Sequence, residues 1–229
     1  MLLQILLEFN WHELLQPQWY IDSGGLWLLL FIIFAETGLL VGFFFPGDSL
    51  LFVAGIFSNK LAAYLYDISA VPDVINLLVV IALCAVAGIL GNVAGYWFGR
   101  KIGPSMFSWK DRFFFKHHYL VQAKEFYEKH GGGAIVFARF LPFIRTFAPI
   151  VAGIVLMDHK KFTFFNVIGC IAWVTIMLAG GHYLDKLFIE KFNFDLKQHL
   201  ELIVLGIVFV TTAPVLFKIF TSKAKKTNK

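Results

Sequence analysis

Two apolar stretches interrupted by charges and prolines constrain this chain more than any other feature of its sequence. They run over residues 34–55 and 137–153. Their charged residues are Glu36 and Asp48 in the first stretch and Arg139 and Arg145 in the second. A charged side chain at the depth of a bilayer costs roughly 2.5–3.5 kcal/mol on translocon scales, so four such charges need partners inside the protein. The pattern predicts a polar site enclosed within a membrane protein.

The composition agrees with this setting. Of 229 residues, 59% are hydrophobic and 15% are charged, whereas soluble domains have about 45–50% apolar and about 25% charged residues. Cys84 and Cys170 both lie in apolar runs, which predicts neither a disulfide framework nor a metal cluster. Because the sequence shows no phosphate-binding loop, zinc-protease motif or supported Ser/His/Asp arrangement, we expect no enzyme, no metal or other cofactor and no nucleic-acid partner.

Apolar runs of spanning length predict an all-α polytopic membrane protein. Uninterrupted transmembrane helices are expected at residues 74–98, 162–183 and 202–220. Two further runs are broken by polar residues or prolines, which is typical of re-entrant segments. We expect one hairpin over residues 26–66 with its tip near Pro46, and a second over 133–157 with its tip between Pro142 and Thr146. A complete span over residues 26–45 is the alternative.

The rest of the chain is expected to flank this region. Residues 26–221 would form one transmembrane domain. The segment 1–25 lacks the basic start of a signal peptide and contains Glu8, so we expect an amphipathic segment that lies on the membrane surface and is retained. A cytoplasmic amphipathic loop is expected over residues 100–130, and a basic cytoplasmic tail over 222–229.

The distribution of basic residues predicts the orientation. No Lys or Arg precedes Lys60, whereas basic residues crowd the central loop and the C-terminus. By the positive-inside rule the N-terminus is outside and the C-terminus is cytoplasmic. The two hairpins then enter from opposite sides, which predicts two inverted re-entrant hairpin-plus-transmembrane-helix repeats and an additional C-terminal transmembrane helix. Phe-Ala-Glu…Val-Ala-Gly in the first hairpin and Phe-Ala-Arg…Val-Ala-Gly in the second support a duplication, and chance similarity is the alternative.

Small residues recur at every fourth position of the predicted helix 74–98. They are Ala87, Gly91, Gly95 and Gly99, and this spacing favours close packing against another helix. Asn92, beside this stripe, is expected either to cap a hairpin tip, to line a cavity or to bond between helices. Pro46 and Pro142 are expected to pack or to line the cavity at the hairpin tips.

Three motifs follow one another in the sequence. They are Glu36…Pro46-Gly47-Asp48, then Gly91-Asn92-x-x-Gly95-Tyr96-x-x-Gly99-Arg100-x-x-Gly103, then Arg139-Phe140-x-Pro142-x-x-Arg145-Thr146. Their order over residues 25–220 resembles the DedA family of bacterial inner-membrane proteins, which shares the VTT domain of lipid scramblases. The resemblance implies paired re-entrant hairpins, dependence on the proton-motive force and movement of lipids such as undecaprenyl phosphate. It also implies that the family's required acids and arginines are Glu36, Asp48, Arg139 and Arg145.

The chemistry of these residues fits a lipid-phosphate substrate. Arginine presents a planar fork of donors to phosphate oxygens, so Arg139 and Arg145 are predicted to bind an anionic headgroup. Glu36 and Asp48 are predicted to exchange protons during transport. The expected partners are therefore an anionic lipid or polyprenyl phosphate, membrane phospholipids and protons, and a homo-oligomer is left open. A purely structural ion-pair cluster is the alternative for these four residues.

The predicted function is a transporter or flippase of the bacterial cytoplasmic membrane that is coupled to the proton-motive force. A passive phospholipid scramblase or membrane-organising protein is one alternative, and a proton-coupled ion or small-solute carrier is the other. A response to a pH gradient separates the first two classes. The lipid, the direction of transport and the coupling ion stay open.

Overall fold

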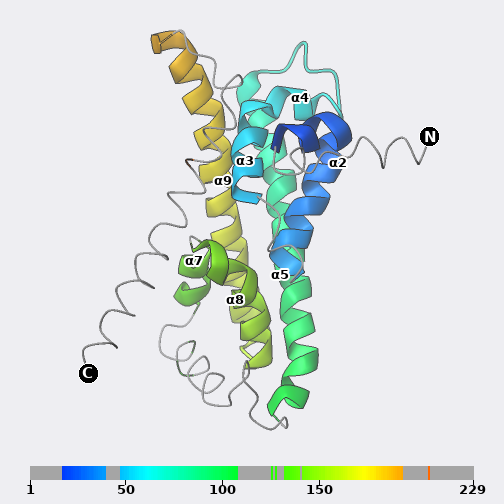
Figure 1. The fold of residues 1–229 in the computed structure, drawn as a ribbon, viewed down its shortest axis with the longest axis vertical. Helices are drawn as coiled ribbons and strands as arrows, with labels where there is room; N and C mark the ends of the chain where they lie inside the picture. The colour runs from blue at the N-terminus through cyan, green and yellow to red at the C-terminus, as the bar shows by residue number, and fades with distance from the viewer. Residues whose placement is uncertain are drawn as a thin grey trace, which may run out of the picture.

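The computed structural model describes residues 17–39, 47–107, 125, 127, 132–139, 141–192 and 206. Every regular element in this part of the chain is a helix (Figure 1). The helices are α2 (Pro17–Gly38), α3 (Gly47–Ile56), α4 (Ser58–Ala62), α5 (Asp73–Phe107), α7 (Gly133–Ala138), α8 (Pro142–Ile154) and α9 (His159–Phe192). The predicted all-α class is therefore confirmed for the described residues.

Two long helices form the frame of the molecule. Helix α5 has 35 residues and α9 has 34, which at 1.5 Å per residue makes each about 50 Å long. They contact each other near their middles, where the Cys170 thiol lies 3.5 Å from the Ala85 carbonyl oxygen. The predicted spans 74–98 and 162–183 fall inside these two helices. Both helices exceed the roughly 30 Å of a hydrocarbon core.

Three described helices contain segments long and apolar enough to cross a membrane. These segments are Tyr20–Gly38, Asp73–Gly103 and His159–Lys191. Large apolar side chains such as Trp27, Leu78, Leu90 and Ile176 are exposed on these helices. Because lipid tails are as apolar as these side chains, an exposed apolar helix surface is typical of a protein that faces lipid. The third predicted span, residues 202–220, lies outside the described residues apart from Gly206.

Helix α2 is divided by a kink at Gly25. This glycine has φ 55°, a left-handed conformation that residues with a side chain rarely adopt. A Cβ at this position would also overlap the ring of Tyr64. The kink coincides with the predicted end of the amphipathic segment 1–25, of which residues 1–16 lie outside the described residues.

The helix pairs α2–α3 and α7–α8 occupy the two predicted hairpins. In the second pair α7 ends at Ala138, and Pro142 is the first residue of α8. A proline suits this position because its fixed φ matches a helix and its missing N–H has no helical partner there. The tip therefore lies just before the predicted range Pro142–Thr146. In the first pair, α3 begins at Gly47, and residues 40–46 lie outside the described part.

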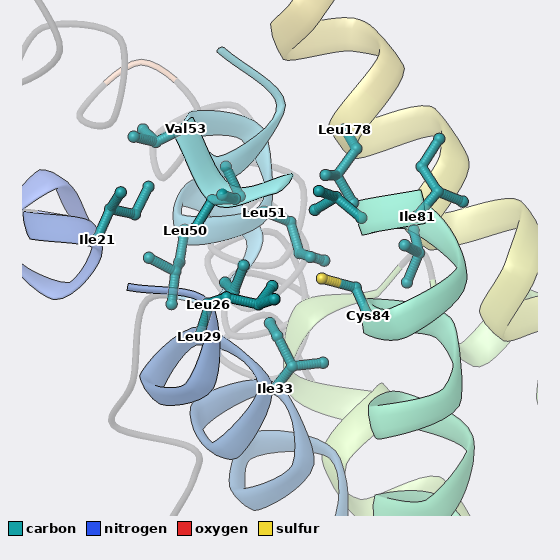
Figure 2. Close-up of a cluster of buried hydrophobic side chains, with 14 of the residues drawn as sticks. Ile21, Leu26, Leu29, Ile33, Leu50, Leu51, Val53, Ile81, Cys84 and Leu178 are labelled. Carbon is teal, nitrogen blue, oxygen red and sulfur yellow. The ribbon is translucent and has the colours of Figure 1, made fainter. Parts of the chain in front are cut away.

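The main core fills the space between the first hairpin and the long helices. Figure 2 shows Leu29 from α2, Leu50 and Leu51 from α3, Cys84 from α5 and Leu178 from α9 in one cluster between these helices, and all five are fully buried. A second, smaller core joins α5, α7, α8 and α9 through Tyr96, Ile135, Ala152 and Phe162. Each hairpin is thus packed against the long helices by its own core.

Glycines bring each hairpin into backbone contact with a long helix. A Cβ at Gly181 of α9 would overlap the Phe52 carbonyl oxygen of α3, and a Cβ at Gly99 of α5 would overlap the Ile150 carbonyl oxygen of α8. The reverse contacts also occur. Gly55 of α3 lies against the Leu178 carbonyl, and Gly153 of α8 lies against the Tyr96 carbonyl. On each of these four helices the glycine follows the contacted carbonyl residue by three positions. The same reciprocal contact therefore joins α3 to α9 and α8 to α5.

The small-residue stripe of α5 packs as predicted. A Cβ at Gly91 would overlap the Thr37 hydroxyl of α2, and one at Gly95 would lie 3.2 Å from the Gly38 carbonyl oxygen. The side-chain amide of Asn92 donates to the Gly88 carbonyl of its own helix at 2.9 Å. The stripe therefore fixes the end of α2 against α5.

Candidate functional site

The two hairpins meet through one arginine. Arg145, in the first turns of α8, donates from Nη1 to the Asp48 carboxylate and from Nη2 to the Glu36 carboxylate. Its side chain is 9% exposed, and those of Glu36 and Asp48 are 4% and 15% exposed. Residues separated by about a hundred positions in the sequence therefore form one buried ion-pair cluster.

Local structure places both carboxylates at the end of the first hairpin. Glu36 lies in the last turn of α2, and Asp48 lies in the first turn of α3. Gly47 begins α3 directly beside the Glu36 carboxylate, and a Cβ there would overlap that carboxylate. The N-terminus of a helix carries a partial positive charge, so it stabilises both acids. A glycine is therefore required at position 47 for Glu36 to reach this position.

Arg139 lies apart from the carboxylates. It follows the last residue of α7, it is 5% exposed, and its Nη2 donates to the side-chain oxygen of Asn166. The Asn166 amide in turn donates to the Ile89 carbonyl oxygen of α5 at 3.3 Å. No carboxylate of the described residues forms an ion pair with Arg139. Of the two predicted arginines, one meets both acids and the other meets a neutral amide.

Trp173 of α9 connects the two arginines. Its indole N–H donates to the Asp48 carboxylate at 2.9 Å. The Arg145 guanidinium carbon lies 4.7 Å from the centre of the indole ring, and that of Arg139 lies 6.0 Å from it. Cation–π contacts of this kind contribute about 2 kcal/mol or more when they are desolvated, and Trp173 is 3% exposed. One buried ring therefore contacts both guanidinium groups and one carboxylate.

The sequence reasoning missed Asn166 and Trp173. Both lie on α9, seven residues apart, and residues with this spacing share one helix face. Asn166 was detectable as an isolated polar residue in the predicted span 162–183. Trp173 carried no such signal, because tryptophan is common in apolar spans.

The remaining predicted residues support the site rather than join it. Gly91 and Gly95 pack against the end of α2, and Asn92 bonds within α5. Pro142 begins α8 three residues before Arg145 and so fixes where this helix starts. Pro46 lies outside the described residues.

The fold and the site define an all-helical membrane protein with a buried charge cluster between two helical hairpins. A model of the VTT domain matches residues 45–183, which include Asp48, Arg139 and Arg145. The chain is 35% identical over 225 residues to Protein DedA of Escherichia coli (strain K12), covering 97% of this chain and 95% of that protein. It belongs to the DedA family of VTT-domain membrane proteins.

Other relatives agree with this assignment. Inner membrane protein YqjA of Escherichia coli (strain K12) is 34% identical over 188 residues, which cover 81% of this chain and 78% of that protein. An uncharacterized membrane protein of Mycobacterium leprae (strain TN) is 38% identical over 201 residues, covering 87% of this chain and 82% of that protein. No solved structure matches the chain.

Proposed function

We propose that this protein moves a lipid-linked phosphate, such as undecaprenyl phosphate, or an anionic phospholipid across the bacterial cytoplasmic membrane and couples this movement to protons. The observation that carries the proposal is the bridge from Arg145 to Glu36 and Asp48 across the two hairpins. Acids that can take up protons thus share an arginine that can also bind phosphate. Protonation of one acid would release part of the arginine for the headgroup.

The helix lengths support re-entrant hairpins. The kink at Gly25 divides the candidate span Tyr20–Gly38 of α2 and leaves a straight part from Leu26 to Gly38, while α8 runs from Pro142 to Ile154. At 1.5 Å per residue each of these 13-residue segments is about 20 Å long, which is shorter than a hydrocarbon core of roughly 30 Å. Helix α3, with 10 residues, is about 15 Å long. Such segments reach the middle of a bilayer and return, so the charge cluster would lie at mid-depth.

The reciprocal glycine contacts support an inverted repeat. The contact of α3 with α9 matches the contact of α8 with α5, although the two hairpins extend toward opposite ends of the molecule (Figure 1). Inverted repeats allow a central site to open alternately to each side of a membrane. The additional C-terminal span and an outside N-terminus complete the proposed topology.

Cysteine labelling tests this topology. Asp22 precedes the Gly25 kink and is exposed, and Lys101 lies near the far end of α5 and is exposed. In a background with Cys84 and Cys170 replaced by serine, Asp22→Cys is expected to label only from outside the cell, and Lys101→Cys only after permeabilisation. Labelling of both positions from the same side would contradict the inverted arrangement.

The proposed function is tested by reconstitution with undecaprenyl phosphate. Arg145→Lys keeps the charge but loses the planar fork, so we expect it to insert normally and to lose most of its transport per inserted molecule. Arg100→Lys is the matched control, because Arg100 is half-buried on α5 and donates to the Tyr96 hydroxyl at 2.8 Å, away from the charge cluster. Normal transport by Arg145→Lys would contradict a phosphate-binding role, and transport that falls only with the amount of folded protein would support a structural cluster.

A further inference from the structure

The two arginines differ in a way that assigns them different tasks. Resting on the proposed function, we propose that Arg139 binds the anionic headgroup first and is positioned for this by Asn166 and Trp173 of α9, while Arg145 can join it only after protonation loosens the ion-pair cluster. Asn166 and Trp173 are thus positioning residues of the substrate site. The sequence motifs alone treat both arginines alike.

Charge compensation distinguishes the two side chains. Arg145 bonds to two carboxylates, so an incoming phosphate must compete with existing ion pairs. Arg139 bonds to the neutral Asn166 amide, which satisfies a donor but compensates no charge. A buried cation without a counter-charge is costly to maintain. An anionic headgroup would supply that counter-charge without breaking an ion pair.

The surroundings of Arg139 hold it in place while leaving donors available. Asn166 is fully buried and is fixed on its other side by the Ile89 carbonyl of α5. Gly169 makes room for the side chain, because a Cβ there would lie 3.1 Å from Arg139 Cδ. A guanidinium has five N–H donors in a fixed fork, more than the Asn166 oxygen and the neighbouring Cys170 thiol accept. The fork matches the oxygens of a phosphate monoester.

Trp173 forms part of the proposed headgroup site and connects this site to Asp48. Its ring contacts both guanidinium groups, while its N–H bonds to Asp48. Protonation of Asp48 that alters its hydrogen bond to Trp173 would therefore affect the position of Arg139 through the rigid indole ring. The face of α9 that carries Asn166, Gly169 and Trp173 thus forms one wall of the proposed headgroup site.

Two variants of Asn166, one isosteric and one shorter, test the assignment. Asn166→Asp supplies Arg139 with a carboxylate partner, which would occupy the headgroup site permanently. Asn166→Ser keeps a neutral acceptor and leaves the charge of Arg139 uncompensated. The matched control is Asn76→Asp, the same change at a buried asparagine near the start of α5, where an aspartate can still accept the hydrogen bond from the Tyr66 hydroxyl.

The assay uses full-length protein in vesicles of phosphatidylethanolamine and phosphatidylglycerol that contain graded mole fractions of undecaprenyl phosphate. External phosphatase measures the lipid that reaches the outer leaflet. We expect Asn166→Asp to raise the half-saturating mole fraction about 10- to 100-fold, the factor that corresponds to losing a hydrogen bond to a charged group. Asn166→Ser, which keeps a neutral acceptor but has a shorter side chain, is expected to raise the value less than Asn166→Asp does, and Asn76→Asp to leave the value unchanged.

The alternatives give distinct results. If Asn166 only stabilises a buried arginine, aspartate should preserve transport and serine should lose it, and this reversed order would overturn the assignment of Arg139 while the proposed function stands. An unchanged half-saturating value in Asn166→Asp would overturn it as well. A wild-type protein that moves no undecaprenyl phosphate would instead contradict the proposed function itself. Thermal unfolding of each variant in detergent separates weak binding from poor folding.

Discussion

Removal of the Arg145 side chain provides the most quantitative test of the ion-pair cluster. Arg145→Gln would leave the carboxylates of Glu36 and Asp48 buried without their shared counter-charge. Breaking a buried pair by removing one partner costs about 3–5 kcal/mol. For a chain of 150–250 residues, each kcal/mol lowers the melting temperature by about 2–4 °C, so we expect a decrease of roughly 6–20 °C.

A neutral triple variant isolates the cause of this decrease. Glu36→Gln, Asp48→Asn and Arg145→Gln together keep the shapes of the two acidic side chains, shorten the arginine and remove every charge of the cluster. Replacing a buried ion pair by neutral groups is often tolerated, so this variant should recover at least half of the lost melting temperature while transporting nothing. The control Arg100→Gln should unfold within a few degrees of wild type.

The assay is thermal unfolding in detergent, followed by tryptophan fluorescence. A melting temperature of Arg145→Gln within 2 °C of wild type, which is less than the effect of 1 kcal/mol, would refute the buried cluster as a stabilising contact. A triple variant less stable than Arg145→Gln would refute the explanation by uncompensated charge.

Two further substitutions test the packing and the site. Gly181→Ala should reduce the amount of folded protein, because its Cβ would overlap the Phe52 carbonyl oxygen. The control Gly180→Ala should be tolerated, because its Cβ would lie 3.8 Å from the Phe52 ring. Equal yields of the two variants in membranes would contradict the close approach of α3 and α9. Trp173→Phe keeps a ring but loses the hydrogen bond to Asp48, so transport should fall by about tenfold with normal insertion, and wild-type rates in liposomes would show that this bond is dispensable.

The long helices and the contact between oppositely charged residues could be predicted from the sequence for physical reasons. A run of apolar residues longer than a bilayer is thick has few alternatives to a helix, so α5 and α9 followed from length and composition. Buried charges of opposite sign need one another, so contact between Arg145 and the two acids followed from their placement in apolar segments. The small residues at every fourth position of α5 likewise predicted close packing against another helix, and the structure places Gly91 against α2 and Gly99 against α8.

The details of the second hairpin did not follow from such rules. The turn precedes Pro142 because proline favours the first position of a helix, a preference that competes with its role as a helix breaker. Arg139 bonds to Asn166 because α9 presents that side chain at the matching height, and helix register is fixed by packing across the whole core. Asn166 was visible as an isolated polar residue of a predicted span, but no local pattern in the sequence pairs it with Arg139.

Transport driven by an imposed pH gradient tests the central claim most directly. Vesicles with wild-type protein and undecaprenyl phosphate should move the lipid faster with a gradient than without one. Glu36→Gln keeps the size of the side chain and a hydrogen-bond acceptor for Arg145 but cannot exchange a proton, so it should lose the response to the gradient while retaining at most slow exchange. A gradient response in Glu36→Gln equal to that of wild type would contradict proton coupling through this cluster.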